Sequence, residues 1–392
     1  MDTMGKYQLQ RPAQNPAPLI LPDIRRAAIS PGKPLVLMVG MHLTKTRGGI
    51  TTLTADILGS VIKNDCAFVY LASQAEDFGP FRKILLALTT AVRFVAVCIF
   101  RRPQLVYVHI GSNASLYRES AFILLAKVFR KRIVAHFHAG DFEDYYRRQS
   151  VIGKRFIQRT LAMADRLVAV SEESAGQLYR ANRQLKVTTI PNVINVSAFA
   201  RIPSRDSRQH VGPVRLLFVG AVGKLKGEND LIDALAILKA KGLNIKVSVV
   251  GYDAESLRDR CEHRNVSDLI NHLGPVSMDK RISFFEKADI FVLPTYAEAM
   301  PISVIEAMAA GLAVVTTAVG GIPEIITDGE DGILFPCGDV EALAEKIIFL
   351  INNPKECEKL GKNARRRVRE QMDFAAYTAR LRSEMLGVID SD

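Results

Sequence analysis

Two glutamates separated by seven residues are the clearest candidates for chemistry in this chain. They lie in the stretch AEAMPISVIEAMAAG, with Glu298 before a predicted three-turn helix and Glu306 within it. Pro301 suits the first helical turn, and Gly311 suits the left-handed backbone that ends a helix. The free N–H groups of a helix start bind anions, whereas carboxylates bind hydroxyl groups. The stretch therefore fits a ligand with both phosphate and hydroxyl groups, and a capped core helix with two solvated glutamates is the alternative.

The spacing of the two carboxylates argues against a glycosidase. Eight residues along a helix span about 12 Å at ~1.5 Å per residue. The two carboxylates of a glycosidase lie only ~5–9.5 Å apart across one glycosidic bond. We therefore expect Glu298 and Glu306 to hold two different parts of one long ligand, such as a nucleotide sugar.

A strand, a glycine loop and a helix open each half of the chain. The apolar run 35–40 leads into Gly48 and Gly49 and then into a predicted helix, and the strand 215–219 leads into GAVGKLKG and a second helix. Strand-like and helical runs alternate after both openings, which predicts parallel sheets. We predict an α/β protein with two Rossmann-like, doubly wound domains that face a central cleft.

The composition changes along the chain predict its organisation. The expected parts are a flexible N-terminal arm (1–32), a first domain (33–196), a linker (197–213), a second domain (214–373) and a C-terminal helix (374–392) that packs back on the first domain. The arm has neither a basic start nor a sustained apolar core, so we do not expect a secretory signal. Five scattered cysteines without a C-x-x-C motif indicate a reducing compartment and no metal cluster.

The basic charge belongs to the first half of the chain. Residues 1–200 hold 27 Lys and Arg against 13 Asp and Glu, whereas the remainder holds 25 against 28. An excess of positive charge indicates an anionic partner, either nucleic acid or an anionic membrane surface. No motif interleaves aromatic and basic residues, so nucleic acid is not expected.

Two apolar stretches with basic ends favour a membrane surface. Ile84–Phe100 lies between two basic pairs but is too short, with Arg93 inside, for a membrane span of ~20 residues. A second stretch, Ser120–Arg132, ends in FRKR. We interpret both as domain helices that rest on anionic lipid, although ordinary helices with solvated ends are the alternative.

Three motifs of the second half carry a resemblance to a known family. They are FVGAVGKLKG, ADIFVLPTYAEAMPISVIEAMAAG and VGGIPEIITDGEDGILFPCGD, which cover nearly all of residues 215–345. This half resembles the donor domain of the GT4 family of retaining, GT-B-fold glycosyltransferases. The first half matches more loosely through GGI, VYVHIG, VAHFHAGDF, ADRLVAVSE and IPNVI. The whole most resembles transferases of bacterial capsule, exopolysaccharide and O-antigen assembly.

The resemblance implies roles for individual residues. Glu298 would contact the transferred sugar, Glu306 the ribose hydroxyls, and His138 the donor sugar or the reacting geometry. The donor diphosphate would be bound by Lys226, by the N–H groups of Met300, Ile302 and Ser303, and by Gly48 and Gly49 from the other domain. The family usually has an arginine after the strand glycine, where this chain has Ala221, and Lys224 is the expected substitute.

The resemblance also has implications for metal binding and for the acceptor side of the cleft. Such enzymes generally need no divalent cation, and we expect none here. Asp141, Glu143 and Asp144 look like a D-x-D metal motif, but we interpret them as a solvated helix start. The candidates on the acceptor side are Ser112, Asn113 and Arg118.

We therefore expect a cytoplasmic hexosyltransferase at the inner face of the cytoplasmic membrane. It would move a hexose from a UDP- or GDP-sugar to a lipid-linked saccharide during assembly of a surface polysaccharide. Two alternatives stay open: a catalytically weak nucleotide-sugar-binding partner of another transferase, motivated by Ala221, and a GT-B-fold sugar-nucleotide epimerase.

Overall fold

The computed structural model describes residues 32–43, 45–46, 48–75, 78–203, 212–220, 225–251, 257–274, 276 and 278–391. Nearly all of the predicted N-terminal arm lies outside these residues, as does the middle of the predicted linker. Ala221 and Lys224 also lie outside the described residues.

The first sheet has six parallel strands in the order β2-β1-β3-β4-β5-β6. All residues of β3 and all but the last of β1 are buried, because helices cover both faces of the sheet. The strands are β1 (Leu35–Met41), β2 (Ala67–Gln74), β3 (Leu105–Ile110), β4 (Arg132–Phe137), β5 (Arg166–Ala169) and β6 (Val187–Thr189). Between them lie α1 (Gly49–Gly59), η2 (Val61–Asn64), α2 (Pro80–Phe100), α3 (Ala114–Val128), α4 (Phe142–Arg147), α5 (Val151–Leu161) and α6 (Glu172–Ala181).

The second sheet also has six parallel strands, in the order β12-β11-β10-β7-β8-β9. This order is that of dinucleotide-binding domains, with the strand order reversing between β7 and β10. The strands are β7 (Val214–Val219), β8 (Ile245–Val250), β9 (Ile270–His272), β10 (Ile290–Leu293), β11 (Ala313–Thr317) and β12 (Ile333–Phe335). The helices are α7 (Glu228–Ala240), α8 (Arg258–His263), α9 (Met278–Lys287), α10 (Ile302–Ala309), α11 (Ile322–Ile325), α12 (Val340–Asn352) and α13 (Pro354–Gln371), with η3 (Val196–Phe199) before the sheet and η6 (Ser267–Leu269) within it.

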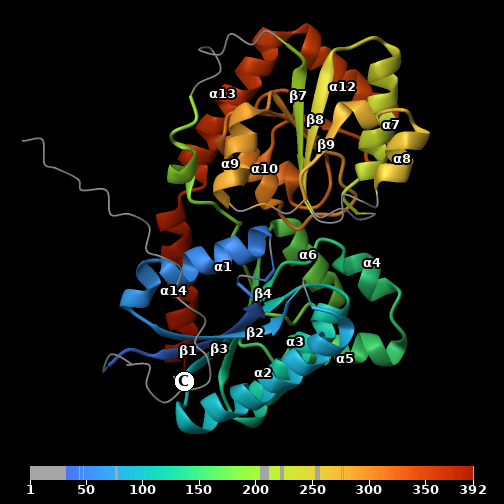
Figure 1. Cartoon of the computed structure of the whole chain (residues 1–392). Helices are drawn as coiled ribbons and strands as arrows, with labels where there is room; N and C mark the ends of the chain where they lie inside the picture. Colours follow the sequence, from blue (N-terminus) through green and yellow to red (C-terminus); the bar gives the residue numbers. More distant parts are fainter. Residues whose placement is uncertain are drawn as a thin grey trace, which may run out of the picture.

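Two helical layers cover the first sheet. One layer comprises α2, α3 and α5, whose inward side chains Phe94, Phe122 and Ile157 share one core with the sheet. The other layer comprises α1 and α14 (Phe374–Asp390), the last helix of the chain. Figure 1 shows that α14, in red, leaves the second domain and lies against the first sheet. It contacts β3, β4 and η2 there.

The two domains meet at the carboxyl ends of their strands (Figure 1). In open α/β sheets ligands bind outside these ends, where the strand order reverses. The two reversal points, β1/β3 and β7/β10, therefore face one cleft. The prediction of a GT-B fold with two doubly wound domains is confirmed.

Some expected element bounds are wrong. α10 is a two-turn helix of eight residues, not a three-turn one, because Pro301 lies in extended backbone before it as the N-cap. Gly311 does have the left-handed backbone that was expected, with φ +74. The second apolar helix is α3, which begins at Ala114 and ends at Val128, since the residues from Arg132 onward form β4.

Candidate active site

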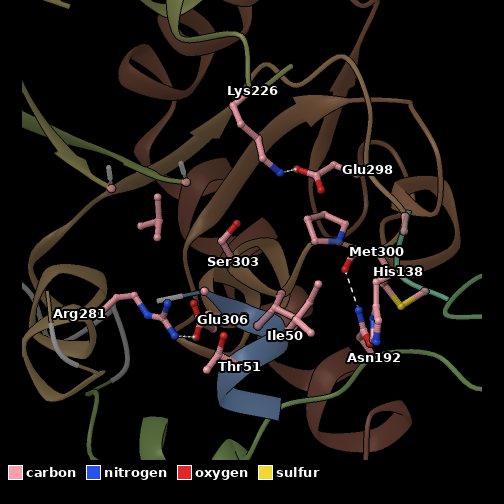
Figure 2. A pocket seen from close by; sticks show the side chains of 18 of the residues that line it. Ile50, Thr51, His138, Asn192, Lys226, Arg281, Glu298, Met300, Ser303 and Glu306 are labelled. Atoms are coloured by element: carbon pink, nitrogen blue, oxygen red, sulfur yellow. Dashed lines mark hydrogen bonds and ion pairs between the residues drawn. The ribbon is translucent and has the colours of Figure 1, made fainter. Parts of the chain in front are cut away.

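A cavity of about 340 Å3 lies between the two domains. Figure 2 shows the labelled side chains around it, which come from loops after the strands and from helices α1, α9 and α10. Nine of the ten residues predicted to bind or react with the donor line it, and the tenth, Lys224, lies outside the described residues. The nine are Gly48, Gly49, His138, Lys226, Glu298, Met300, Ile302, Ser303 and Glu306.

One end of the cavity holds a lysine and a carboxylate. Lys226 Nζ lies 2.5 Å from Glu298 Oε1, and both residues follow strands that flank the β7/β10 reversal point (Figure 2). Gly227 fixes the lysine loop, because a Cβ on its left-handed backbone would lie 1.7 Å from the carbonyl oxygen of Pro294. The pair presents one cation and one hydrogen-bond acceptor side by side.

The other end of the cavity holds an arginine and a carboxylate. Arg281 Nη2, from α9, lies 2.5 Å from Glu306 Oε1, from α10 (Figure 2). Glu306 is 1% exposed, and this burial raises its pKa to about 7, although Arg281 pulls the pKa down. Glu306 Oε2 has no hydrogen-bond partner within the described part of the chain, so it is available to a ligand hydroxyl. No sequence motif singles out Arg281.

The loop that carries Glu298 is held between glycines of both domains. A Cβ on Gly140 would lie 2.4 Å from the backbone carbon of Glu298, and one on Gly320 would lie 1.6 Å from its carbonyl oxygen. A Cβ on Gly49 would similarly lie 2.6 Å from Ile302 Cβ. Glycine therefore permits direct contact between the first domain and the start of α10.

A buried asparagine also joins the two domains at this loop. Asn192 Nδ2 donates to the carbonyl oxygen of Met300 over 3.0 Å (Figure 2). The residue is 3% exposed and lines the cavity. It belongs to the IPNVI motif, which could have revealed it, although sequence analysis did not single it out.

His138 belongs to a stack of three imidazoles. It follows β4, and its Nε2 lies 3.0 Å from His109 Nδ1, whereas His136 Nδ1 lies 2.6 Å from Tyr107 Oη. Burial lowers the pKa of His109 to about 4 and the pKa values of the other two histidines well below their usual range. His138 is therefore neutral at pH 7 and can offer a ligand a hydrogen bond but not a positive charge.

Two clusters of side chains in this region are of the types that bind metal ions: the three histidines and the acidic residues at the start of α4. The ring nitrogens of the three histidines lie within 4.8 Å of one another, close enough to hold an ion. Two of the three ring pairs are stacked, however, with interplanar angles of 28° and 22°, and the third pair is tilted at 36°. One pair of ring nitrogens is also hydrogen-bonded together. Asp141, Glu143 and Asp144 lie at the start of α4, where Glu143 pairs with Arg180 over 2.8 Å. The expectation that no metal is needed stays a prediction.

A second cavity of about 210 Å3 adjoins the first and shares His138, Lys226 and Glu298 with it. Two of the three acceptor candidates, Ser112 and Arg118, line this cavity.

Asn113, the third acceptor candidate, is not among the residues lining the second cavity. Its amide donates to Asp141 Oδ2 over 3.3 Å and to Ser112 Oγ over 3.2 Å. The structure therefore does not bring Asn113 together with the other two candidates at the wall of this cavity.

The second cavity contains a buried carboxylate that no sequence motif predicts. Glu119 is 1% exposed and lies 2.9 Å from Arg118 Nε and 2.7 Å from Ser73 Oγ. Burial raises its pKa, and its Oε2 has no hydrogen-bond partner among the described residues. The position follows Arg118 on α3, and nothing in the sequence marks it.

The fold and the site define a class of protein: two Rossmann-like domains with a ligand cavity at both strand reversals form a GT-B glycosyltransferase fold. The family described as Glycosyltransferase Family 4 matches residues 65–198, and the family described as Glycosyl transferases group 1 matches residues 203–367. The chain belongs to these group 1, family 4 glycosyltransferases, as its motifs predicted.

Individual relatives agree with this assignment. The capsular polysaccharide biosynthesis glycosyltransferase CapM of Staphylococcus aureus is 35% identical over 152 residues, which are 38% of this chain and 40% of CapM. The D-inositol 3-phosphate glycosyltransferase of Streptomyces avermitilis is 30% identical over 235 residues, 55% of this chain and 50% of that protein. The chain spans about half the length of the curated relatives that it matches.

Two solved structures show the same fold at low sequence identity. Sucrose-phosphate synthase (tll1590) from Thermosynechococcus elongatus has a TM-score of 0.78 and 19% identity, over 92% of this chain and all of that one. Anabaena Alr3699/HepE in complex with UDP-glucose has a TM-score of 0.70 and 17% identity, over 90% of this chain and 99% of that one.

Proposed function

We propose that this enzyme transfers a hexose from a UDP- or GDP-sugar to a lipid-linked saccharide and retains the anomeric configuration. The observation that supports it most is the presence of a cation–carboxylate pair at each end of one cavity. A nucleotide sugar carries hydroxyl groups at both ends and a diphosphate between them. This ligand would use the free oxygen of Glu306, the start of α10 and the Glu298–Lys226 pair together.

In the proposed complex, Glu306 accepts hydrogen bonds from the ribose and Glu298 from the transferred sugar. The diphosphate lies against the start of α10, where Ile302 and Ser303 lie in the first helical turn. Lys226 then turns from Glu298 toward the diphosphate, whose negative charge grows as the sugar leaves. Neutral His138 orients the sugar by a hydrogen bond.

The reaction follows from this placement. The bond between the anomeric carbon and the diphosphate oxygen breaks, and the acceptor oxygen bonds to the same face of that carbon. The acceptor proton passes to the departing phosphate oxygen, so no side-chain nucleophile is required. Contact between the domains at Gly140 and Gly49 keeps water away from the reacting carbon.

The second cavity and the relatives support the proposed acceptor and pathway. The second cavity adjoins Glu298 and His138 and offers Arg118 and Ser112 to an acceptor. The likeness to CapM supports a role in assembly of a capsule-type surface polysaccharide, and the Anabaena complex makes UDP-glucose the first donor to test. The basic first half supports a location at the inner face of the cytoplasmic membrane.

A screen of purified UDP- and GDP-hexoses with polyprenyl-diphosphate saccharides tests the proposal. We expect release of nucleotide together with an acceptor that gains the mass of one hexose. Donor isomerisation without acceptor would instead identify an epimerase. Donor binding without nucleotide release, with every acceptor offered, would identify the nucleotide-sugar-binding partner that the Ala221 departure motivates.

A further inference from the structure

The outer face of the first domain is unusually apolar. Twelve of the seventeen large hydrophobic side chains that are exposed in the described part of the chain belong to α2, α3 and α5. These helices lie side by side over one face of the first sheet (Figure 1). We define this outer apolar surface by the twelve residues Phe81, Ile84, Leu85, Leu88, Val92, Ile99, Phe100, Tyr117, Leu124, Val128, Val151 and Ile152.

Helix α2 contributes most of this surface because it has two apolar sides. One side, with Phe94, Val97 and Cys98, is buried against the first sheet. The opposite side exposes a stripe at helical spacing, in which Leu88 is 61% exposed and Val92 70% exposed. An ordinary surface helix would carry polar residues along that stripe, so this one is built for an apolar environment.

Positive charge surrounds the stripe. Residues 80–131 hold nine Lys and Arg and one acidic residue, Glu119, which gives +8. Arg82 and Lys83 are exposed at the start of α2, and Arg102 and Arg130 are exposed at the far ends of α2 and α3. An apolar stripe bordered by cations is typical of a helix that lies in the interface of an anionic bilayer.

We infer that this surface docks on an anionic lipid bilayer, with α2 lying in the membrane plane. Helix α2 begins at Pro80, four residues before the expected stretch, and its 21 residues are long and apolar enough to cross a membrane by length and composition. The expectation that this stretch is too short for a span is therefore wrong. Crossing would strip Phe94 and Val97 from the core of the first domain, whereas lying flat keeps them buried. A second copy of the chain is a poorer occupant because two faces of +8 repel each other.

The outer apolar surface extends to the edge of the cleft. Phe78, two residues before α2, lies under Lys45, with Nζ 4.8 Å from the ring centroid, and Lys45 belongs to the loop that follows β1. At the start of α3, exposed Tyr117 precedes Arg118, which lines the second cavity. An acceptor anchored in the bilayer would therefore meet the second cavity from its own membrane. This last step rests on the proposed function, whereas the docking itself does not.

Vesicle sedimentation with the full chain tests the docking. We expect binding to vesicles of three parts phosphatidylcholine to one part phosphatidylglycerol, and at least tenfold weaker binding to pure phosphatidylcholine. The variant Leu88→Glu/Val92→Glu should also bind the anionic vesicles at least tenfold more weakly. Phe349→Glu, at an exposed apolar position of α12 in the other domain, is the matched control and should bind like the parent.

The outcomes separate this inference from the proposed function. Failure of the parent chain to bind anionic vesicles would overturn the inference, as would unchanged binding of the double variant. Loss of a dimer in the double variant, without vesicle binding by the parent, would assign the surface to a second copy. The Kd for UDP or GDP should be the same in parent and variant, which shows that the variant is folded. Vesicle binding without any nucleotide release would leave docking intact and contradict the transferase.

Discussion

The two walls of the cleft are built differently. The second domain presents carboxylates that are each held by a cation, Lys226 on Glu298 and Arg281 on Glu306. The first domain presents backbone at Gly49 and Gly140 and a neutral His138. The wall of the second domain thus presents charged groups to a charged donor. The wall of the first domain presents closely packed backbone and an uncharged imidazole. Donor binding and transfer should therefore respond separately to changes in the two walls.

The largest effect is expected at Glu298. Glu298→Gln removes the carboxylate that pairs with Lys226 and, in the proposed complex, binds the transferred sugar, so kcat should fall roughly 100- to 1000-fold with a small change in donor KM. Steady-state kinetics of nucleotide release measures this. Glu330→Gln, at an exposed position of the same domain, is the control and should leave kcat unchanged.

The next effect concerns Glu306, at the other end of the same wall. Glu306→Ala removes the proposed ribose contact and takes the carboxylate away from Arg281, whose side chain is 14% exposed. Donor KM should rise about 10- to 100-fold with kcat within about threefold, and breaking the buried pair should destabilise the protein by about 3 kcal/mol. Kinetics and thermal unfolding measure the two effects. Equal, small effects of the Glu298 and Glu306 changes on turnover would contradict the division of roles.

A smaller effect is expected from the first wall. Gly140→Ala places a methyl group against the backbone of Glu298 and should push the domains apart, which lowers kcat about tenfold. Gly59→Ala adds the same methyl group where nothing lies within 4 Å and is the matched control. If both variants retain full activity, the tight contact between the walls does not matter for transfer.

The smallest effect concerns pH. Burial raises the pKa of Glu306 to about 7, so this carboxyl gains a proton as the pH falls through that value. The protonated group accepts fewer hydrogen bonds from the ribose, and donor KM should therefore rise about threefold between pH 8 and pH 6. Glu306→Gln cannot titrate and should give a donor KM with a flatter pH profile. An equally steep profile in this variant would assign the titration to another group.

The strands that build the two walls could be predicted where they are long and apolar. The run 35–40 became β1 (Leu35–Met41), and the predicted strand 215–219 became β7 (Val214–Val219). Strands β9 and β12 have three residues each at the edges of the second sheet, and such short runs carry no periodic signal.

The residues of the site also fall into those that the sequence predicts and those that it does not. Glu298, Glu306 and Lys226 lie in motifs that resemble a known family, and the structure brings them to one cavity. Arg281 and Glu119 lie on ordinary helical stretches and reach the cavities only through tertiary packing. A single sequence cannot show which side chain of a helix meets a carboxylate on another element.

The ribose hydroxyls provide the most direct test of the proposed contact between Glu306 and the donor. Calorimetric titration would compare the Kd of UDP or GDP, whichever binds, with that of its 2′-deoxy analogue, in the parent chain and in Glu306→Ala. If Glu306 contacts the ribose, loss of the hydroxyl should weaken binding about tenfold in the parent and hardly at all in the variant. An equal loss in both proteins would contradict the account, because Glu306 would then not touch the ribose.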